Sequence, residues 1–190
     1  MGLTPLPGKS APEVTEKKVV KMTTDAGELT IEVYPQAAPN AAKRFIELVE
    51  AGFYDNTPIF RVVRAPQPFV AQFGINWRDD FPQWQEKNFD DDPTYFKLDR
   101  GTLAFAKAGP NTNSTQVFIN FGDNSNLASP EYNFTTFGRV VEGLDVIDKF
   151  VPTGSESMEL EQGPLWEDGE KYLKSIEEKP TMITKAEVVQ

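Results

Sequence analysis

Two side-chain types that carry out much enzyme chemistry are missing from this sequence of 190 residues, which contains no His and no Cys. Their absence removes disulfides, thiol nucleophiles, zinc sites built on Cys or His, and every nucleophile activated by imidazole. Three adjacent carboxylates, Asp90, Asp91 and Asp92, suggest calcium at first sight. Adjacent carboxylates cannot all face one ion from a regular element, and the segment lacks the Gly and distal Glu of an EF-hand loop. A solvated or capping role is therefore the better prediction, and no metal site is expected.

An uncharged polar side chain is the next candidate. Residues 104–121 read AFAKAGPNTNSTQVFINF, two apolar runs separated by a cluster of Gly, Pro, Asn, Ser and Thr. Gln116 lies inside the second run, where an isolated amide is more often a buried group satisfied by the backbone than a binding residue. The stretch predicts two strands joined by a loop rich in turn residues.

The composition limits the class of protein. Charged residues make up 25% of the chain and hydrophobic residues 39%, which is typical of a folded globular protein, and no apolar run could cross a bilayer. A formal charge of −10 argues against nucleic acid and anionic membranes as partners. The first residues lack the apolar core of a signal peptide, so we expect a cytoplasmic location; an exported precursor after trimming would look the same.

The elements that must position the polar residues begin after a segment without periodicity. Residues 1–17 are rich in Pro, Gly and Ser and predict a flexible tail, followed by one domain over residues 18–190. The runs VVKMTT and ELTIEVY around DAG predict a hairpin, and Pro39 to Gly52 bound an amphipathic helix. IFRVV and PFVAQFG predict two strands, separated by a loop because RAPQ and the proline after it prevent regular pairing there.

Later segments complete the pattern. FTTFGRVV and TMITKAEVVQ alternate as strands, EGLDVIDKFV predicts a short helix, and a further acidic helix is expected from Trp166 to Ile176. Many strands with two or three helices fit a closed β-barrel with helical caps, because a barrel leaves no strand edge exposed.

Several of these stretches, in this order, resemble the cyclophilin family of peptidyl-prolyl cis-trans isomerases. AKAGPNTNSTQVFI is similar to the segment around that family's AGPNTN loop, VAQFG to its IQGG strand, and TFGRVVEGLDVIDK to its VFGKVVEGMDVVDK segment. The match spans about residues 19–150 and includes the last strand. It implies a mainly β fold, a closed eight-stranded antiparallel β-barrel capped by two or three α-helices, with an insertion at about residues 153–179.

The resemblance also implies roles for individual residues. Arg61 corresponds to the catalytic arginine, and Gln72 to the glutamine that fixes this arginine and the substrate backbone. The remaining residues are implied to bind the substrate: Phe69, Val70, Phe118 and Leu127 around the proline ring, Ala106, Lys107 and Ala108 along the peptide, Gln116 by a hydrogen bond, and Phe134 in the place of a customary His. Taken singly, each of these residues is more often structural.

The implied reaction explains how a chain without His or Cys could be an enzyme. Rotation about a peptide bond meets a barrier of about 18–20 kcal/mol, and no covalent bond has to break. In the twisted state the prolyl nitrogen regains a lone pair that can accept a hydrogen bond, and an arginine is a donor that stays charged. No cofactor is implied. The partners implied are proline-containing peptides and unfolded or folding proteins, bound by a monomer.

Some positions depart from the family. Phe60 stands where a His usually precedes the catalytic arginine, and Asn126 stands where many members carry a rim Trp that helps to bind cyclosporin, so weakened cyclosporin binding is expected. The RAPQP loop is longer than the family's, and it or the insertion could reshape the substrate groove.

Two other functions remain open. A cyclophilin-like module could bind proline-containing segments without accelerating their rotation, although Arg61 and Gln72 argue against this alternative. An unrelated acidic β-barrel could bind a small ligand, or calcium through Asp90, Asp91 and Asp92.

Overall fold

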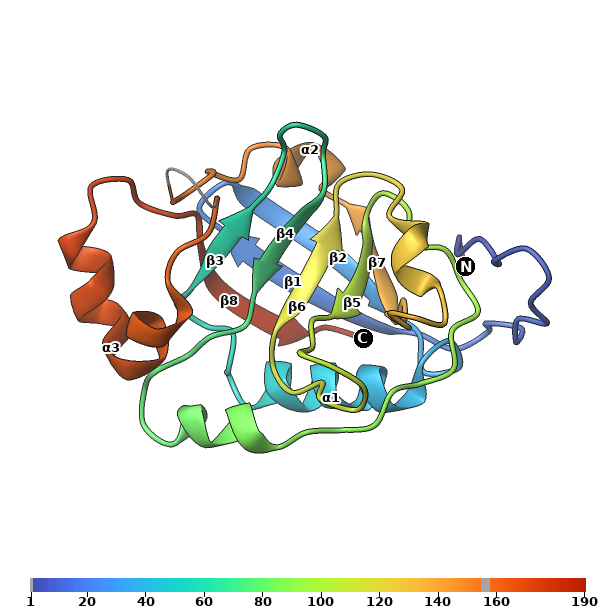
Figure 1. The fold of residues 1–190 in the computed structure, drawn as a ribbon. Coiled ribbons are helices and arrows are strands. Elements are labelled where there is room, and N and C mark those ends of the chain that lie inside the picture. Colours follow the sequence, from blue (N-terminus) through green and yellow to red (C-terminus); the bar gives the residue numbers. More distant parts are fainter. Residues whose placement is uncertain (1, 155–157) are drawn as a thin grey trace.

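The computed structural model describes residues 2–154 and 158–190. Figure 1 shows these residues folded around one barrel. The elements, in chain order, are β1 (Lys18–Thr24), β2 (Gly27–Val33), α1 (Pro39–Glu50), β3 (Thr57–Val62), β4 (Val70–Phe73), the 3-10 helix η1 (Phe81–Glu86), β5 (Thr102–Phe105), β6 (Val117–Asn120), the 3-10 helix η2 (Ser125–Ala128), β7 (Gly138–Glu142), α2 (Leu144–Ile147), α3 (Gln162–Ser175) and β8 (Met182–Val188).

The strands form a closed barrel in the order β1-β2-β7-β5-β6-β4-β3-β8, and every neighbouring pair is antiparallel. Figure 1 shows α1 below the barrel, α2 above it and α3 beside β3. The predicted closed eight-stranded antiparallel barrel with two or three helices is confirmed.

The helix α1 covers one side of the hydrophobic core. Pro39 occupies the first turn, and the apolar stripe that includes Phe45 and Leu48 is fully buried. Gly52 follows the helix with φ of +76°, a left-handed conformation that Gly adopts without steric cost and that ends the helix. The predicted helix and its end are confirmed, because both depend on local sequence signals.

Part of the segment predicted as an insertion, residues 158–160, lies along β3. The strand β8 pairs with β3 at Thr57 and Pro58, and farther along β3 the neighbour is the segment 158–160. The Leu160 N–H donates to the Phe60 carbonyl at 2.8 Å, and the Val62 N–H donates to the Met158 carbonyl at 3.2 Å. These bonds extend the sheet beside Arg61, which forms an antiparallel bridge with Glu159.

The helix α3 packs behind this added edge. Leu165 is fully buried with Phe60, Ile75 and Leu160. The helix begins four residues before the predicted start at Trp166 and bends at Asp168, whose φ and ψ are −158° and 82°. Gly169 allows a close approach there, because a Cβ at this position would lie 2.1 Å from the Trp77 ring.

The N-terminal segment, described from residue 2, follows the surface of the barrel. The Leu6 N–H donates to the Tyr95 carbonyl and the Lys97 N–H to the Thr4 carbonyl, both at 2.8 Å. Farther along, the Thr15 N–H donates to the Gln36 side chain at 2.7 Å. The predicted flexibility of residues 1–17 concerns motion and stays a prediction.

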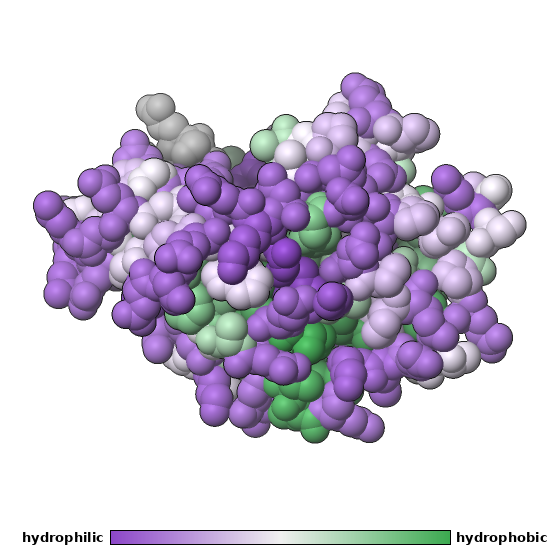
Figure 2. All heavy atoms as spheres, turned by 90° about the horizontal axis from the view of Figure 1, so that it is seen from below, coloured by the Kyte–Doolittle hydropathy of each residue, from purple (hydrophilic) through white to green (hydrophobic). Residues whose placement is uncertain are grey.

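The outer surface is mainly polar where Figure 2 shows it. In that view from below, hydrophilic residues cover most of the face, the most hydrophobic residues gather near its lower edge, and smaller hydrophobic areas lie elsewhere. Within the described part of the chain, no helix combines the length and the apolar character needed to span a bilayer.

Candidate functional site

Four neighbouring strands place one row of side chains on the outside of the barrel. Arg61 of β3 lies opposite Gln72 of β4, Gln72 opposite Phe118 of β6, and Phe118 opposite Ala104 of β5. Because side chains alternate between the two faces of a sheet, Ala71 and Phe73 beside Gln72 enter the barrel core. The register thus brings residues far apart in sequence to one external surface.

A register shift in β3 gives Arg61 its position. Ile59 and Val62 both belong to the barrel core, although regular alternation would place them on opposite faces. The shift lies between Ile59 and Arg61, and the extra residue, Phe60, turns to the separate cluster under α3. Such bulges are common beside active sites, where they redirect a side chain. The sequence gives no clear signal for this one.

The row borders a pocket of about 210 Å³. Phe118 and Phe134 form an edge-to-face pair in its wall, with ring centroids 5.6 Å apart. The structure brings together nine of the predicted site residues as the lining: Arg61, Phe69, Val70, Gln72, Ala106, Lys107, Phe118, Leu127 and Phe134. The pocket is therefore an apolar cup with a guanidinium and an amide at its edge.

Arg61 is held from two sides. Its Nη1 donates to Gln72 Oε1 at 3.3 Å, and its Cζ lies 5.8 Å from the centroid of the Phe69 ring. Gln72 is 7% exposed, so its amide is fixed within the sheet and can orient the arginine. An arginine that is held in place and permanently charged can donate to a group in the pocket at any working pH.

The two remaining predicted residues, Ala108 and Gln116, line a neighbouring cavity of about 460 Å³ rather than the pocket itself. Gln72, Ala106 and Lys107 border both spaces. The cavity also contains polar residues that sequence reasoning did not identify: Gln85, Asn88, Thr112, Ser114 and Gln162. Gln162 comes from α3, whose position against the barrel the resemblance did not imply.

The loop rich in turn residues is braced at several points. Thr112 Oγ1 accepts hydrogen bonds from the Ala108 and Gly109 N–H groups and donates to the Gly109 carbonyl, all within 3.0 Å. Asn111 has φ of +58°, and its side chain accepts the Asp91 N–H at 2.8 Å. The loop therefore holds Ala106 to Ala108 as a wall of the groove.

A buried ion pair supports this wall from below. Lys107 Nζ lies 3.0 Å from Asp91 Oδ2 and 5.2 Å from the centroid of the Phe134 ring, and the lysine side chain is 4% exposed. Burial alone would raise the pKa of Asp91, but hydrogen bonds from Asn113 and Lys107 outweigh it and hold the pKa below its ordinary value. The resemblance implied that Lys107 lies along the peptide; the role of its side chain was missed.

Asp92 has the predicted capping role. Its carboxylate accepts the Asn40 N–H at 3.0 Å and the Ala41 N–H at 2.9 Å, at the first turn of α1. Burial raises the pKa of Asp92 despite these two bonds. The capping interpretation is confirmed for this residue.

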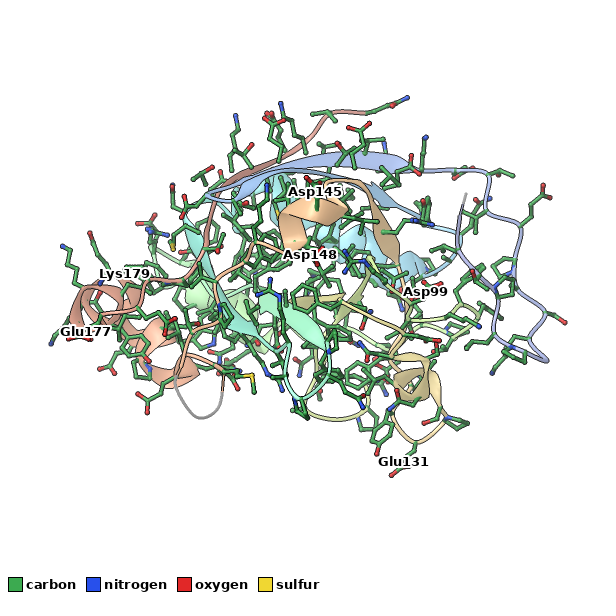
Figure 3. The ribbon with its side chains drawn as sticks, turned by 90° about the horizontal axis from the view of Figure 1, so that it is seen from above. Asp99, Glu131, Asp145, Asp148, Glu177 and Lys179 are labelled. Carbon is green, nitrogen blue, oxygen red and sulfur yellow. The ribbon has the colours of Figure 1, made fainter. Side chains whose placement is uncertain are left out.

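Many acidic groups lie at the surface. Figure 3 shows Glu131 on the loop between η2 and β7, pointing outward, and Asp148 directly after α2. Asp148 pairs with Arg100 at 2.9 Å, and both side chains are well exposed. Beside Arg61, by contrast, one carboxylate lies close: Glu159 Oε2 is 3.9 Å from Arg61 Nε.

The positions that depart from the family have different surroundings. Phe60 is fully buried against α3, so it fills the space under the segment 158–160. Asn126 is exposed on η2, next to the pocket residue Leu127.

Comparisons with known proteins agree with this geometry. Residues 19–165 match the family model described as cyclophilin type peptidyl-prolyl cis-trans isomerase/CLD. A peptidyl-prolyl cis-trans isomerase of Acinetobacter baylyi is 33% identical over 145 residues, which cover 74% of this chain and 76% of that protein.

Solved structures show the same fold. A cyclophilin type isomerase of Cryptosporidium parvum superposes with a TM-score of 0.68 at 22% identity, covering 92% of this chain and 99% of that one. A structure of that isomerase in the presence of the dipeptide Ala-Pro gives a TM-score of 0.66 at 22% identity, covering 90% and 99%. The barrel, the ordered motifs and the family match together establish that this chain belongs to the cyclophilin-type peptidyl-prolyl cis-trans isomerase family.

Proposed function

We propose that this protein accelerates cis-trans rotation about X-Pro bonds by donating a hydrogen bond from Arg61 to the prolyl nitrogen. The observation that carries the proposal is the position of Arg61, bonded to Gln72 at the edge of an apolar pocket. The likeness to a structure solved in the presence of Ala-Pro supports a proline-containing substrate.

The catalysis consists of differential stabilisation. A planar amide nitrogen accepts hydrogen bonds poorly because its lone pair is delocalised into the carbonyl, whereas the nitrogen of a twisted amide regains that lone pair. A donor that is already aimed therefore stabilises the twisted state more than the planar one, which is the requirement for lowering a barrier. Phe69, Val70 and Phe118 would hold the proline ring while the preceding residue rotates.

The substrates would be proline-containing segments of unfolded or folding proteins. The pocket lining contains one apolar cup and one guanidinium, which suit a proline ring and its amide and select little else.

The test measures exchange between the cis and trans forms of a short Ala-Pro peptide by NMR. We expect the wild-type protein to accelerate exchange and Arg61→Ala to reduce the acceleration by at least ~100-fold, the order reported for loss of one preorganised donor. Arg100→Ala is the matched control, because Arg100 is exposed and pairs with Asp148 outside the pocket.

Wild-type protein that binds the peptide without accelerating exchange would identify a binding module instead. Equal activity of Arg61→Ala and wild type would overturn the role of Arg61. Thermal unfolding of each variant shows whether its fold is intact.

We also infer weak binding of cyclosporin, because exposed Asn126 stands where related proteins carry a rim tryptophan. Asn126→Trp should raise the affinity by adding an aromatic surface beside Leu127. Titration of both proteins with cyclosporin checks this expectation, and an unchanged affinity counts against it.

A further inference from the structure

The predicted insertion places two side chains in contact with the polar residues of the site. The segment 158–160 carries Glu159 beside Arg61, and the first residue of α3, Gln162, reaches Gln116. Gln162 also donates a hydrogen bond to the Glu159 carboxylate. Neither residue belongs to the strands that build the pocket.

These contacts close a ring of five side chains. Arg61 Nη1 donates to Gln72 Oε1 at 3.3 Å, and Gln72 Nε2 donates to Gln116 Oε1 at 2.8 Å. Gln116 Nε2 donates to Gln162 Oε1 at 2.9 Å, and Gln162 Nε2 donates to Glu159 Oε1 at 2.8 Å. The second carboxylate oxygen, Oε2, lies 3.9 Å from Arg61 Nε and completes the circuit.

The two charged members determine how the three amides are oriented. An ionised carboxylate can only accept hydrogen bonds, so Gln162 must present its NH₂ group to Glu159. Its oxygen then faces Gln116, which must present its own NH₂ group to that oxygen. The oxygen of Gln116 in turn faces the NH₂ group of Gln72. Gln72 therefore presents its oxygen to the guanidinium, which can only donate. Without an acceptor at one end and a donor at the other, each amide could flip.

The ring also directs the guanidinium. Arg61 Nε is buried and makes no hydrogen bond within the described residues, so the carboxylate of Glu159 is the charge that compensates it. Gln72 occupies Nη1. In the described part of the chain Nη2 has no hydrogen-bond partner, which leaves its donors for a group in the pocket.

We propose that Glu159 and Gln162 are positioning residues, which act through Gln116 and Gln72 to hold Arg61 in the orientation that faces the substrate amide. The proposal rests on the proposed isomerase function for its kinetic consequence. The orientation of Arg61 itself can be measured without any substrate.

The decisive variant is Glu159→Gln, which keeps the size of the side chain, removes its charge and replaces a group that can only accept by an amide that can also donate. We expect the exchange rate of a saturating Ala-Pro peptide to fall about tenfold, as for a modest misplacement of a reacting group. The peptide dissociation constant should stay close to that of the wild type, because Glu159 does not line the pocket and the loss falls on the rate. Gln162→Ala should act in the same direction, since it interrupts the relay while Glu159 remains.

A second readout reports on Arg61 directly. The Nε–Hε resonance of Arg61, assigned by its loss in Arg61→Ala, should shift in Glu159→Gln and in Gln162→Ala. The matched control is Glu161→Gln, the same chemical change on an exposed neighbour that makes no side-chain cap on α3. In Glu161→Gln, the Arg61 resonance and the peptide exchange rate should equal those of the wild type.

The failures of the two proposals are distinguishable. If wild-type protein does not accelerate exchange, the isomerase function fails, and the Arg61 resonance still decides whether the ring orients Arg61. An unchanged Arg61 resonance in a folded Glu159→Gln protein overturns the ring. A shifted resonance with an unchanged rate overturns the positioning role.

Discussion

The Lys107 ammonium is one of the most buried charges of this chain, with a side chain 4% exposed under the groove wall. It contacts the Asp91 carboxylate at 3.0 Å and donates to the Asn133 carbonyl at 3.0 Å. Taking two charges out of water is costly, so the pair stabilises the fold only because each partner has these further bonds. Removing one partner leaves the other charge partly buried and uncompensated.

We expect Lys107→Met to lower the free energy of unfolding by about 2–3 kcal/mol, near the low end for a broken buried pair, since Asp91 keeps its bonds from Asn113 and Asn111. Methionine preserves the apolar contact with Phe134. Urea unfolding at pH 7 measures the change, with Lys149→Met as the exposed control, for which about 0.5 kcal/mol or less is expected.

Acid provides a second check of the same pair. In the folded protein the pKa of Asp91 lies below its ordinary value, which it keeps in the unfolded chain. The contribution of Asp91 to stability is therefore complete above the unfolded pKa and is lost as the pH falls through the folded pKa. Wild-type stability should therefore fall more steeply than that of Lys107→Met below about pH 4. Parallel curves for the two proteins, or equal stability at pH 7, would contradict the account.

Residue identities at the site were largely predictable. Arg61 and Gln72 were chosen from motifs, and the structure places them opposite each other. Glu159 and Gln162 were not identified, because they lie beyond residue 150, outside the matched motifs, and the docking of residues 158–160 along β3 depends on long-range packing. For Gln116 the available signal was a single Gln inside an apolar run. Its hydrogen-bond partners, Gln72 and Gln162, come from distant parts of the chain.

At the scale of elements, α1 depends on a residue far away in the sequence. Ala38 precedes the helix and provides no side-chain cap, so the first free N–H groups are satisfied by Asp92 instead. The bond couples the helix to the irregular segment before β5, which carries Asp91 and so connects to the groove wall. Local sequence alone predicted the helix and left its cap unassigned.

Asp92→Ala should lower the free energy of unfolding by about 1–2 kcal/mol, the usual cost of removing a helix cap. Asp92→Asn retains one acceptor oxygen and should lose less. Urea unfolding gives the energies, and hydrogen exchange at Asn40 and Ala41 shows whether the loss lies at this end of the helix. Unchanged exchange at both amides would exclude the capping role.

Helices and strands were predicted well where the local sequence determines them, and poorly where their shape depends on contacts with distant segments. The β1–β2 hairpin required alternation and a Gly turn, and its register runs without a break. The bulge at Phe60 could not be predicted, because it arises when a neighbouring segment offers a separate apolar site for that side chain. The bend in α3 at Asp168 likewise reflects contact with Trp77.

For the molecule as a whole, the ordered family motifs predicted the fold, whereas only the tertiary structure shows what surrounds the pocket. A chain with a formal charge of −10 places around its candidate catalytic cation mainly amides and aromatic rings. Among the described residues, the carboxylate close to Arg61 is that of Glu159, in the segment 158–160. The family resemblance therefore predicted the apolar pocket, but it could not predict which group compensates the charge of Arg61.

The pairing of residues 158–160 with β3 has one more consequence. A strand with open N–H and C=O groups is a template to which any extended peptide can add itself as a further strand. An open β3 could bind such a peptide through backbone hydrogen bonds beside Arg61 rather than through a proline in the pocket. By occupying the Phe60 carbonyl and the Val62 N–H with its own backbone, the segment 158–160 closes this part of β3 to a further strand.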